Sequence, residues 1–360
     1  MLRPKPYIEK IAKSIHGGPD RAELRKKGLN AAGIIDFSVS TNPFRLPRAV
    51  HASLHGASIH QYPDSDARDF INALVEKTGC VAENLVAGSG STELIRSAAA
   101  AYVDRDDIVV TLEPTYSEYE LACRLHSAQV KRFKLKAAHD FRFDVNVFLD
   151  YARQYRPKAI FICNPNNPTG GYIDREPFEK ILSTFRSTLV ILDEAYLAFT
   201  QNTWDSLQLL NYNNLLIIRS LTKDYGLAGL RLGYAVASRD IVAAIKKVLP
   251  PWNVNSMAQQ AGIAALTNNG YLERQTARIQ AGKQHLENQF RKIGFKVVPS
   301  RTNFFLVRVG NAASFRDKLL RIGFLVRDCA SFGLPEYIRV AARGISDCRR
   351  LIIAVREIGS

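Results

Sequence analysis

The feature that most constrains the fold is a series of short apolar runs between residues 85 and 238, which alternate with helical stretches. The clearest of these runs are Ile108–Thr111, Ala159–Cys163, Leu189–Leu192, Leu215–Arg219 and Leu232–Ala237. Consecutive apolar residues bounded by turns are typical of strands that are buried on both faces of a mainly parallel sheet. The sequence therefore predicts an α/β protein whose large domain is built on such a sheet.

The rest of the chain predicts a second, smaller domain. Residues 256–292 carry apolar residues at helical spacing and predict one long helix. The tail predicts a small α+β arrangement, with strands at 295–298, 303–309 and 337–342 and helices at 313–322 and 345–358. We predict an N-terminal arm with a short helix and part of the small domain over residues 1–45, the large domain over 46–255, and the C-terminal small domain over 256–360.

The composition excludes several classes of protein. Hydrophobic residues make up 46% of the chain and charged residues 23%, which are values typical of a soluble globular protein. No apolar run reaches the ~18 residues that a membrane span needs, so we expect no membrane partner. The five cysteines form no CxxC pair, which favours reduced thiols in the cytoplasm over disulfides and predicts no metal site.

The net charge of +15 has two interpretations. It can reflect a solvated basic surface, or it can attract anionic ligands or nucleic acid. The basic residues are spread along the whole chain, and none of the denser runs lies in a helix-turn-helix, RNP or zinc-finger context. We therefore favour small anions as ligands and expect no nucleic-acid partner.

Polar segments follow several of the predicted strands. They are Gly88–Glu93, Asn164–Gly170, Asp193–Tyr196 and Ser220–Lys223, with Arg231 eight residues after the last of them. Ligands bind at the carboxyl ends of the strands in open parallel sheets, and these segments would meet at that edge.

Each segment also has a simple structural explanation. The glycine pair can merely start a helix, the Asn-rich stretch can be a surface loop, and the carboxylate can be a helix cap. The functional interpretations are an anion-binding helix start, an Asn that reaches a ligand, a buried carboxylate that needs a partner, and a Schiff-base lysine at Lys223. The shared order and location of the segments favour the functional interpretations.

In the order and spacing of these segments the sequence resembles the fold-type I pyridoxal-phosphate (PLP) enzymes, from about residue 15 to the C-terminus. It is most similar to the branch that holds histidinol-phosphate aminotransferase and L-threonine-O-3-phosphate decarboxylase. The resemblance implies a PLP-dependent transferase fold of type I, pyridoxal 5'-phosphate as cofactor, and a large domain that binds it.

The resemblance also assigns roles around the cofactor. Lys223 would bind it as a Schiff base and move the proton, Asp193 would pair with the pyridinium nitrogen, and Tyr116 would stack on the ring. The other expected contacts are Ser91, Thr92, Ser220 and Arg231 with the phosphate, and Asn167 and Tyr196 with the ring 3-oxygen. Tyr62 would reach the cofactor phosphate of a neighbouring subunit, which implies a homodimer.

The substrate side is less regular. Arg339 matches the arginine that binds the substrate carboxylate, and the further candidates are Arg327, His16, Asn42 and Glu9. Arg45 and Arg343 are additional candidates for a substrate phosphate, whereas Glu9 would suit a guanidinium. The segment Asn42–Pro47 carries Arg45 where the similar enzymes have a small glycine, and this departure lies beside the expected substrate entrance.

These observations leave several reactions open. The first choice is an enzyme that acts at Cα of a small amino acid in the manner of L-threonine-O-3-phosphate decarboxylase. The alternatives are a PLP-dependent cyclase or elimination enzyme on a modified amino acid such as hydroxyarginine, and an aminotransferase of the histidinol-phosphate type. A non-catalytic PLP-binding regulator is the alternative from a different class.

Overall fold

The large sheet has seven strands within the described part of the chain and places the candidate residues at one edge. The computed structural model describes residues 2–3, 8–9, 11, 17–268 and 270–359. In spatial order the strands are β2 (Leu85–Gly88), β8 (Gly233–Ala237), β7 (Leu215–Ser220), β6 (Leu189–Asp193), β5 (Ala159–Cys163), β3 (Ile108–Glu113) and β4 (Gln129–Lys134). Only β8 runs against its neighbours, so the prediction of a mainly parallel sheet is confirmed.

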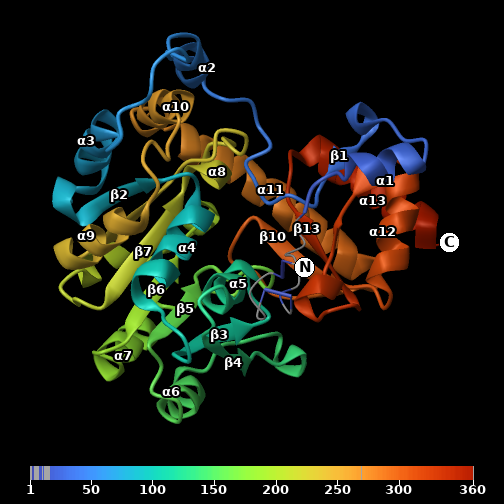
Figure 1. The fold of residues 1–360 in the computed structure, drawn as a ribbon. Coiled ribbons are helices and arrows are strands. Elements are labelled where there is room, and N and C mark those ends of the chain that lie inside the picture. The colour runs from blue at the N-terminus through green and yellow to red at the C-terminus, as the bar shows by residue number, and fades with distance from the viewer. Residues whose placement is uncertain (1, 4–7, 10, 12–16, 269, 360) are drawn as a thin grey trace.

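Helices cover both faces of this sheet, as Figure 1 shows. One face packs against α4 (Ser91–Tyr102), α5 (Glu118–Arg124) and α9 (Arg239–Val248). The other packs against α3 (Arg68–Thr78), α6 (Val145–Arg153), α7 (Arg175–Thr184) and α10 (Ser256–Leu266). The central strands are apolar at consecutive positions because side chains alternate between the faces and both faces are covered.

The strand directions bring distant segments to one edge. β2, β5, β6 and β7 all point the same way, so the residues that follow them lie together. Arg231 reaches this edge by a different route, because it lies just before β8, which runs in the opposite direction. The reversed strand therefore adds an arginine to the same edge.

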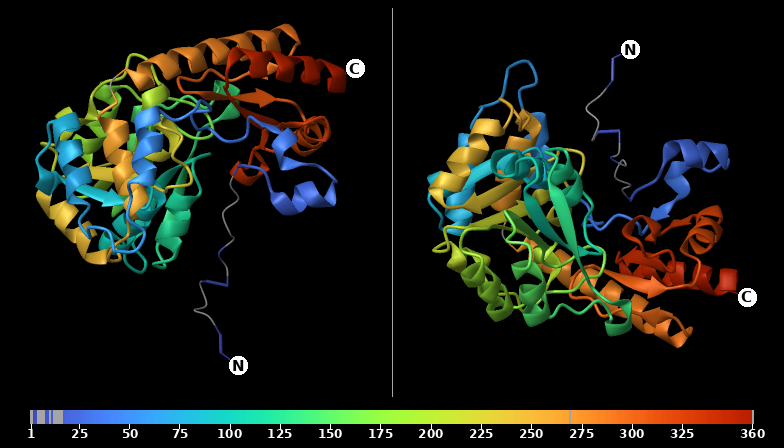
Figure 2. Two further views of the ribbon diagram at one scale, coloured as in Figure 1. Left: turned by 90° about the horizontal axis from the view of Figure 1, so that it is seen from above. Right: turned by 60° about the horizontal axis from the view of Figure 1, so that its bottom comes forward.

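The smaller unit contains a four-stranded sheet in the order β12 (Arg327–Asp328), β13 (Tyr337–Ala341), β10 (Phe304–Arg308) and β9 (Lys296–Val297). All its pairings are antiparallel. Helices α12 (Ala312–Arg321) and α13 (Ile345–Gly359) and part of α11 (Tyr271–Lys292) pack against it. The two views of Figure 2 show this unit beside the large sheet, with α11 running from one to the other.

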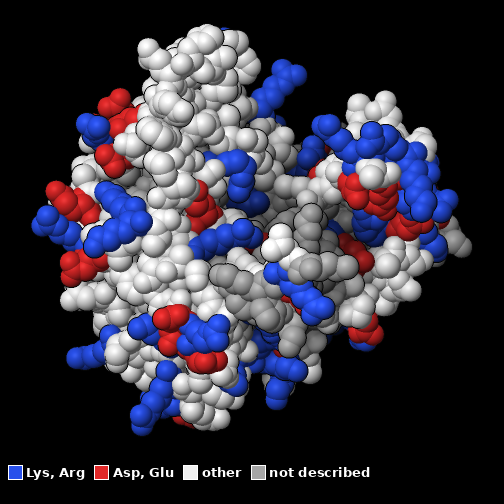
Figure 3. Space-filling view, in the orientation of Figure 1, with Lys and Arg blue, Asp and Glu red and all other residues white. Residues whose placement is uncertain are grey.

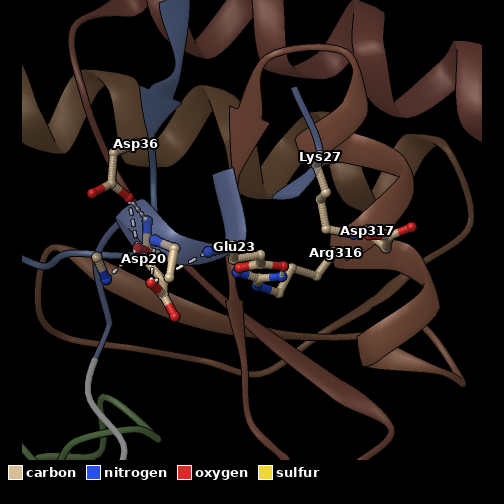
Figure 4. Close-up of polar contacts among 9 residues, drawn as sticks. Asp20, Glu23, Lys27, Asp36, Arg316 and Asp317 are labelled. Atoms are coloured by element: carbon tan, nitrogen blue, oxygen red, sulfur yellow. Dashed lines mark hydrogen bonds and ion pairs between the residues drawn. The ribbon is translucent and has the colours of Figure 1, made fainter. Parts of the chain in front are cut away.

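The N-terminal segment joins the smaller unit. The short strand β1 (Ile35–Asp36) pairs in parallel with β11 (Phe324–Leu325). Helix α1 (Arg21–Lys26) lies against α12, and Figure 4 shows the ion pairs Glu23–Arg316 and Lys27–Asp317 that connect this region to α12. Helix α2 (Arg48–His55) follows β1 in the chain, before the first strand of the large sheet, and packs against α10.

The predicted long helix over residues 256–292 is wrong. The structure has two helices, α10 and α11, separated by a break that ends at Gly270, whose φ of +72° suits glycine. Helix α10 packs against α2 and α3 and contributes to the core of the large sheet. It therefore lies with the large unit, one helix beyond the predicted boundary at residue 255.

Charge is distributed broadly over the surface. Figure 3 shows Lys and Arg side chains in scattered groups on both units, with Asp and Glu among them. Within the described ranges, none of the helices combines the length and apolar character required to cross a membrane.

Candidate active site

A cavity of about 440 Å³ lies at the carboxyl edge of the large sheet and is closed on one side by the smaller unit. Most of the predicted site residues line it. They are Ser91, Thr92, Tyr116, Asn167, Asp193, Tyr196, Ser220, Lys223, Arg231, Arg327 and Arg339. The structure therefore gathers residues from all four polar segments and from the smaller unit.

One end of the cavity is built to hold an anion. Helix α4 begins at Ser91, directly after Gly90, whose φ is +79°. A Cβ atom at Gly90 would lie 2.6 Å from Nη2 of Arg231, so glycine lets the guanidinium approach the helix start in its observed position. Ser220 also lines the cavity, and its register partner Gly233 lies against the backbone of Gly90 and Ser91. Helix N–H groups together with an arginine fork suit a phosphate group.

Lys223 lies in the short helix α8 (Leu221–Asp224), immediately after β7. Its Nζ is 5.8 Å from the centre of the Tyr196 ring. Burial lowers the pKa of its amine to about 8, and the positive charges of Arg339 and Arg231 act in the same direction. A substantial fraction of this amine is uncharged near neutral pH, as a nucleophile or general base requires.

Asp193 ends β6 and is buried. Its Oδ1 accepts a hydrogen bond from the N–H of Ala195 at 2.9 Å, and its Oδ2 accepts one from the Tyr119 hydroxyl at 2.7 Å. Burial raises the pKa of this carboxyl, while the two hydrogen bonds and Lys223 lower it. The carboxylate is thus held in one orientation at the floor of the cavity.

Tyrosines form part of the walls. The hydroxyl of Tyr116 lies 3.2 Å from Oγ1 of Thr92, and burial raises its pKa to about 12. The ring of Tyr196 packs edge-on against Phe304 at 4.9 Å, and burial raises the pKa of its hydroxyl as well. Both phenols therefore stay protonated at neutral pH and can donate hydrogen bonds.

The smaller unit contributes two buried arginines. Arg327 of β12 and Arg339 of β13 are register partners in the antiparallel sheet. Arg339 donates to the side-chain oxygen of Asn167 and to the carbonyl of Ser38, whereas Arg327 donates to Ser331. Burial and the neighbouring Arg339 charge lower the pKa of Arg327. Two adjacent guanidinium groups make this wall strongly cationic.

The remaining predicted residues that the structure describes lie elsewhere. The side chain of Asn42 donates to the carbonyl of Asp224 and to the Tyr271 hydroxyl, which gives it a structural role outside the cavity lining. Glu9 is exposed and does not line the cavity, and His16 lies outside the described residues. Tyr62 is 79% exposed.

The extra phosphate candidates also point away from the cavity. Arg45 is exposed, and its segment is anchored by a hydrogen bond from Tyr271 to its carbonyl. Arg343 is occupied by Asp347 and by the carbonyl of Asp36. Neither side chain lines the cavity, so among the described residues Arg327 is the predicted phosphate candidate that lines it.

The sequence interpretation missed several lining residues, among them Ser38, Ser40, Arg96, Glu118, Tyr119, Cys163, Thr222 and Phe332. Tyr119 and Glu118 carried a usable signal, because they lie within one helical turn of Tyr116. Ser38 and Ser40 carried none, since the segment after β1 reaches the site only through the pairing of β1 with β11.

The residues present fit the cofactor that the sequence resemblance implies. Three buried polar atoms of the lining, Oγ of Ser40, Oγ1 of Thr222 and Nε of Arg339, have no hydrogen-bond partner among the described residues. Buried polar groups need partners, which a bound polar ligand would supply. The anion-binding end, the amine of Lys223 and the carboxylate of Asp193 match a phosphate, an aldehyde carbon and a pyridine nitrogen.

Comparison with known proteins agrees with this geometry. Residues 32–354 match the family described as "Aminotransferase class I and II". Histidinol-phosphate aminotransferase 1 of Cupriavidus pinatubonensis is 35% identical over 361 residues, covering 98% of this chain and 95% of the relative.

Solved structures share the same fold. The histidinol-phosphate aminotransferase from Clostridium acetobutylicum is 26% identical with a TM-score of 0.82, over 90% of this chain and 99% of that one. The L-threonine-O-3-phosphate decarboxylase from Porphyromonas gingivalis is 25% identical with a TM-score of 0.81, over the same shares of the two chains. The chain therefore belongs to the class I and II aminotransferase family, a family of enzymes whose cofactor is pyridoxal phosphate.

Proposed function

We propose that this enzyme is an aminotransferase of the histidinol-phosphate type, which moves an amino group from a phosphorylated amino compound to a 2-oxo acid. The observation that carries the proposal is the arginine pair: Arg327 and Arg339 are buried side by side in the wall of the cavity that contains Lys223. The guanidinium fork suits both phosphate and carboxylate groups.

The chemistry of the two substrates explains why such a pair is useful. Histidinol phosphate carries a phosphate and no carboxylate, whereas the 2-oxo acid that accepts the amino group carries carboxylates. An enzyme that binds both in turn needs cations that accept either anion. The relative with 35% identity across nearly the whole chain, itself named histidinol-phosphate aminotransferase, supports this reaction.

In this proposal the bound cofactor supplies a ring that takes up the electron pair of the substrate Cα–H bond. Lys223, with its pKa near 8, accepts the Cα proton and later returns a proton to the substrate. Asp193 holds a proton at the ring nitrogen. Arg339 orients the substrate by its anionic group, and the buried walls exclude water from the reacting carbon.

The decarboxylase interpretation, which the sequence placed first, has weaker support. A threonine-phosphate decarboxylase is a structural neighbour at 25% identity, while the relative with higher identity is an aminotransferase. The cyclase interpretation is also weaker, because Glu9, the proposed partner of a substrate guanidinium, lies outside the cavity lining. Inside the cavity, Glu118 is paired with Arg96 at 2.8 Å.

Substrate profiling tests the proposal. The PLP-loaded enzyme is incubated with histidinol phosphate and 2-oxoglutarate, and in parallel with phosphothreonine and with hydroxyarginine, and products are identified by mass spectrometry. We expect glutamate from the first mixture only. Carbon dioxide released from phosphothreonine, without glutamate from histidinol phosphate, would replace the proposal with the decarboxylase reaction.

Arg327→Gln should separate substrate recognition from chemistry. We expect KM for histidinol phosphate to rise roughly 10- to 100-fold, since a hydrogen bond to a charged group contributes about 1.5–3 kcal/mol. The matched control is Arg343→Gln, because Arg343 belongs to the same unit but points to Asp347. If both variants keep the wild-type KM, Arg327 does not bind the phosphate.

We also propose a homodimer in which Tyr62 serves the neighbouring subunit. Tyr62 stacks on Trp252 at 4.5 Å, and Ile59 beside it is 70% exposed. Exposed apolar side chains of this size favour burial against another chain. Sedimentation should give roughly twice the chain mass of 40.2 kDa at micromolar concentration.

A complementation experiment tests whether Tyr62 acts across the dimer. Tyr62→Ala and Lys223→Ala chains are co-expressed with different tags, and the mixed dimer is purified. If Tyr62 acts in the neighbouring subunit, one site of the mixed dimer has an intact Lys223 and an intact Tyr62, and about half the wild-type activity returns. An active monomer, or a mixed dimer no more active than Tyr62→Ala alone, would contradict the proposal.

The proposed compartment is the cytoplasm. All five cysteines are free in the structure, and four of them are buried. Buried free thiols are typical of proteins that work in a reducing environment.

A further inference from the structure

Tyr119 is a fully buried tyrosine that the assigned roles leave unexplained. It lies in the first turn of α5, with its ring stacked on Phe161 of β5 at 5.4 Å and edge-on to Tyr116 at 5.5 Å. A phenylalanine could make the same ring contacts. The ring contacts therefore do not explain the hydroxyl. An unpaired buried hydroxyl lowers the stability of the fold, so this one must have a partner.

The Tyr119 hydroxyl bonds the Asp193 carboxylate and also lies beside the thiol of Cys163. It donates a hydrogen bond of 2.7 Å to Oδ2 of Asp193, while Oδ1 accepts from the N–H of Ala195 at 2.9 Å. Cys163 and Asp193 are register partners at the ends of β5 and β6, so their side chains share the face that α5 covers. Tyr119 thus reaches the carboxylate from the helix layer, behind the cavity.

The other groups that face Asp193 do not duplicate this contact. Lys223 is the nearby cation, and the thiol of Cys163 donates to the carbonyl of Pro165. Glu194, the adjacent carboxylate, is paired with Arg219 at 2.8 Å. Burial raises the pKa of the Tyr119 phenol well above its usual value, so the hydroxyl remains a donor throughout the working pH range.

We propose that Tyr119 is a positioning residue, whose hydrogen bond to Asp193 keeps the shared proton on the ring nitrogen of the cofactor. When a carboxylate and a pyridine nitrogen share one proton, the more basic group holds it. A hydrogen bond donated to the carboxylate makes it less basic, so the proton stays on nitrogen. Without that bond the proton moves to the carboxylate, and the neutral ring takes up electrons poorly.

This inference rests on the cofactor of the family and is independent of the substrate proposed above. It also assigns a function to the hydroxyl of Tyr119, by which this side chain of α5 reaches Asp193. Asp193 alone does not fix where the proton lies, because burial favours the neutral carboxylic acid and opposes the charged pair. The Tyr119 hydroxyl shifts that balance toward the ion pair.

The test is Tyr119→Phe loaded with PLP labelled with ¹⁵N at the ring nitrogen. The ¹⁵N chemical shift distinguishes a protonated ring nitrogen from a neutral one. We expect the wild type to show the protonated shift and Tyr119→Phe to move toward the neutral one. We expect kcat to fall at least about tenfold, equivalent to ~1.4 kcal/mol, with a smaller change in KM.

Tyr116→Phe is the matched control. It removes a tyrosine hydroxyl from the same cavity, but that hydroxyl contacts Thr92 and not Asp193. We expect its ¹⁵N shift to match the wild type even if its activity falls. A protonated ring nitrogen and a kcat within twofold of wild type in Tyr119→Phe would overturn the inference. A wild-type protein that binds no PLP would instead refute the cofactor assignment, and circular dichroism separates both outcomes from misfolding.

Discussion

Lys223→Ala is expected to lose all detectable turnover while remaining folded. The side chain lies in a four-residue helix and lines the cavity, so we expect its truncation to leave the apolar core of the large sheet in place. What it removes is the only lysine amine in the cavity lining formed by the described residues. Borohydride should therefore attach PLP covalently to the wild type and not to the variant, as intact-protein mass spectrometry would record.

The pH dependence of cofactor attachment gives a second readout. Because the pKa of the Lys223 amine is lowered to about 8, the fraction of reactive, uncharged amine rises with pH through 8 and then levels off. An ordinary lysine would continue to gain reactivity toward pH 10.4. The rate at which the apoenzyme takes up PLP should therefore rise with pH and level off above about pH 8.

Lys283→Met is the control for this result. Lys283 is also a buried lysine with a lowered pKa, but it lies in α11, where it donates to the carbonyl of Ser300. We expect its covalent PLP adduct to form as in the wild type. A fully active Lys223→Ala enzyme, or an adduct that disappears in Lys283→Met instead, would show that the cofactor is attached elsewhere.

Asp193→Asn should reduce kcat by roughly a hundredfold or more, equivalent to ~2.7 kcal/mol, while the protein still folds and binds PLP. Asparagine keeps the shape of the side chain and can still accept from the N–H of Ala195 at Oδ1, while its NH2 group faces the Tyr119 hydroxyl and can donate to that oxygen. It carries no negative charge, so it cannot stabilise a protonated ring nitrogen. Burial raises the pKa of Asp193, so a neutral residue is tolerated at this position.

Glu194→Gln serves as the comparison, because it neutralises the next carboxylate along the chain, which faces Arg219 and not the cavity. We expect Glu194→Gln to lower the thermal stability of the protein, because the ion pair with Arg219 is lost, while the ring nitrogen of the cofactor stays protonated. If Asp193→Asn lowers kcat by less than about tenfold, Asp193 merely caps the loop that follows β6 and the electron-sink role must be assigned to another group.

The sequence predicted best those elements whose surroundings are uniform. β5 is apolar throughout, and β6 and β7 are apolar except at their last one or two positions, because helices cover both faces of the sheet. Continuous apolar runs of this kind are easy to recognise. β4 escaped notice because it is the edge strand and its sequence QVKRFK is mostly polar. The break before α11 was missed because the apolar pattern continues on both sides of it.

The site residues differ in the same way in how far the sequence predicts them. Cofactor residues were predictable because they follow strands in a fixed order along the chain, and the sheet directions bring them together. The partnership of Tyr119 with Asp193 joins residues 74 positions apart, and it depends on which face of β6 the carboxylate occupies. Asn42 was misplaced for a similar reason, since its use by Asp224 and Tyr271 is visible only in the folded chain.

The pairing of β1 with β11 has a consequence for the order in which the protein is completed during synthesis. Ile35 is the register partner of Phe324, and its N–H donates to the carbonyl of Gly323, so this contact cannot form until nearly the whole chain has left the ribosome. The strands of the large sheet all lie between residues 85 and 237, and they can associate earlier. The N-terminal segment must wait for its C-terminal partner, and the cavity wall that carries Arg327 and Arg339 is the last part of the enzyme to be assembled.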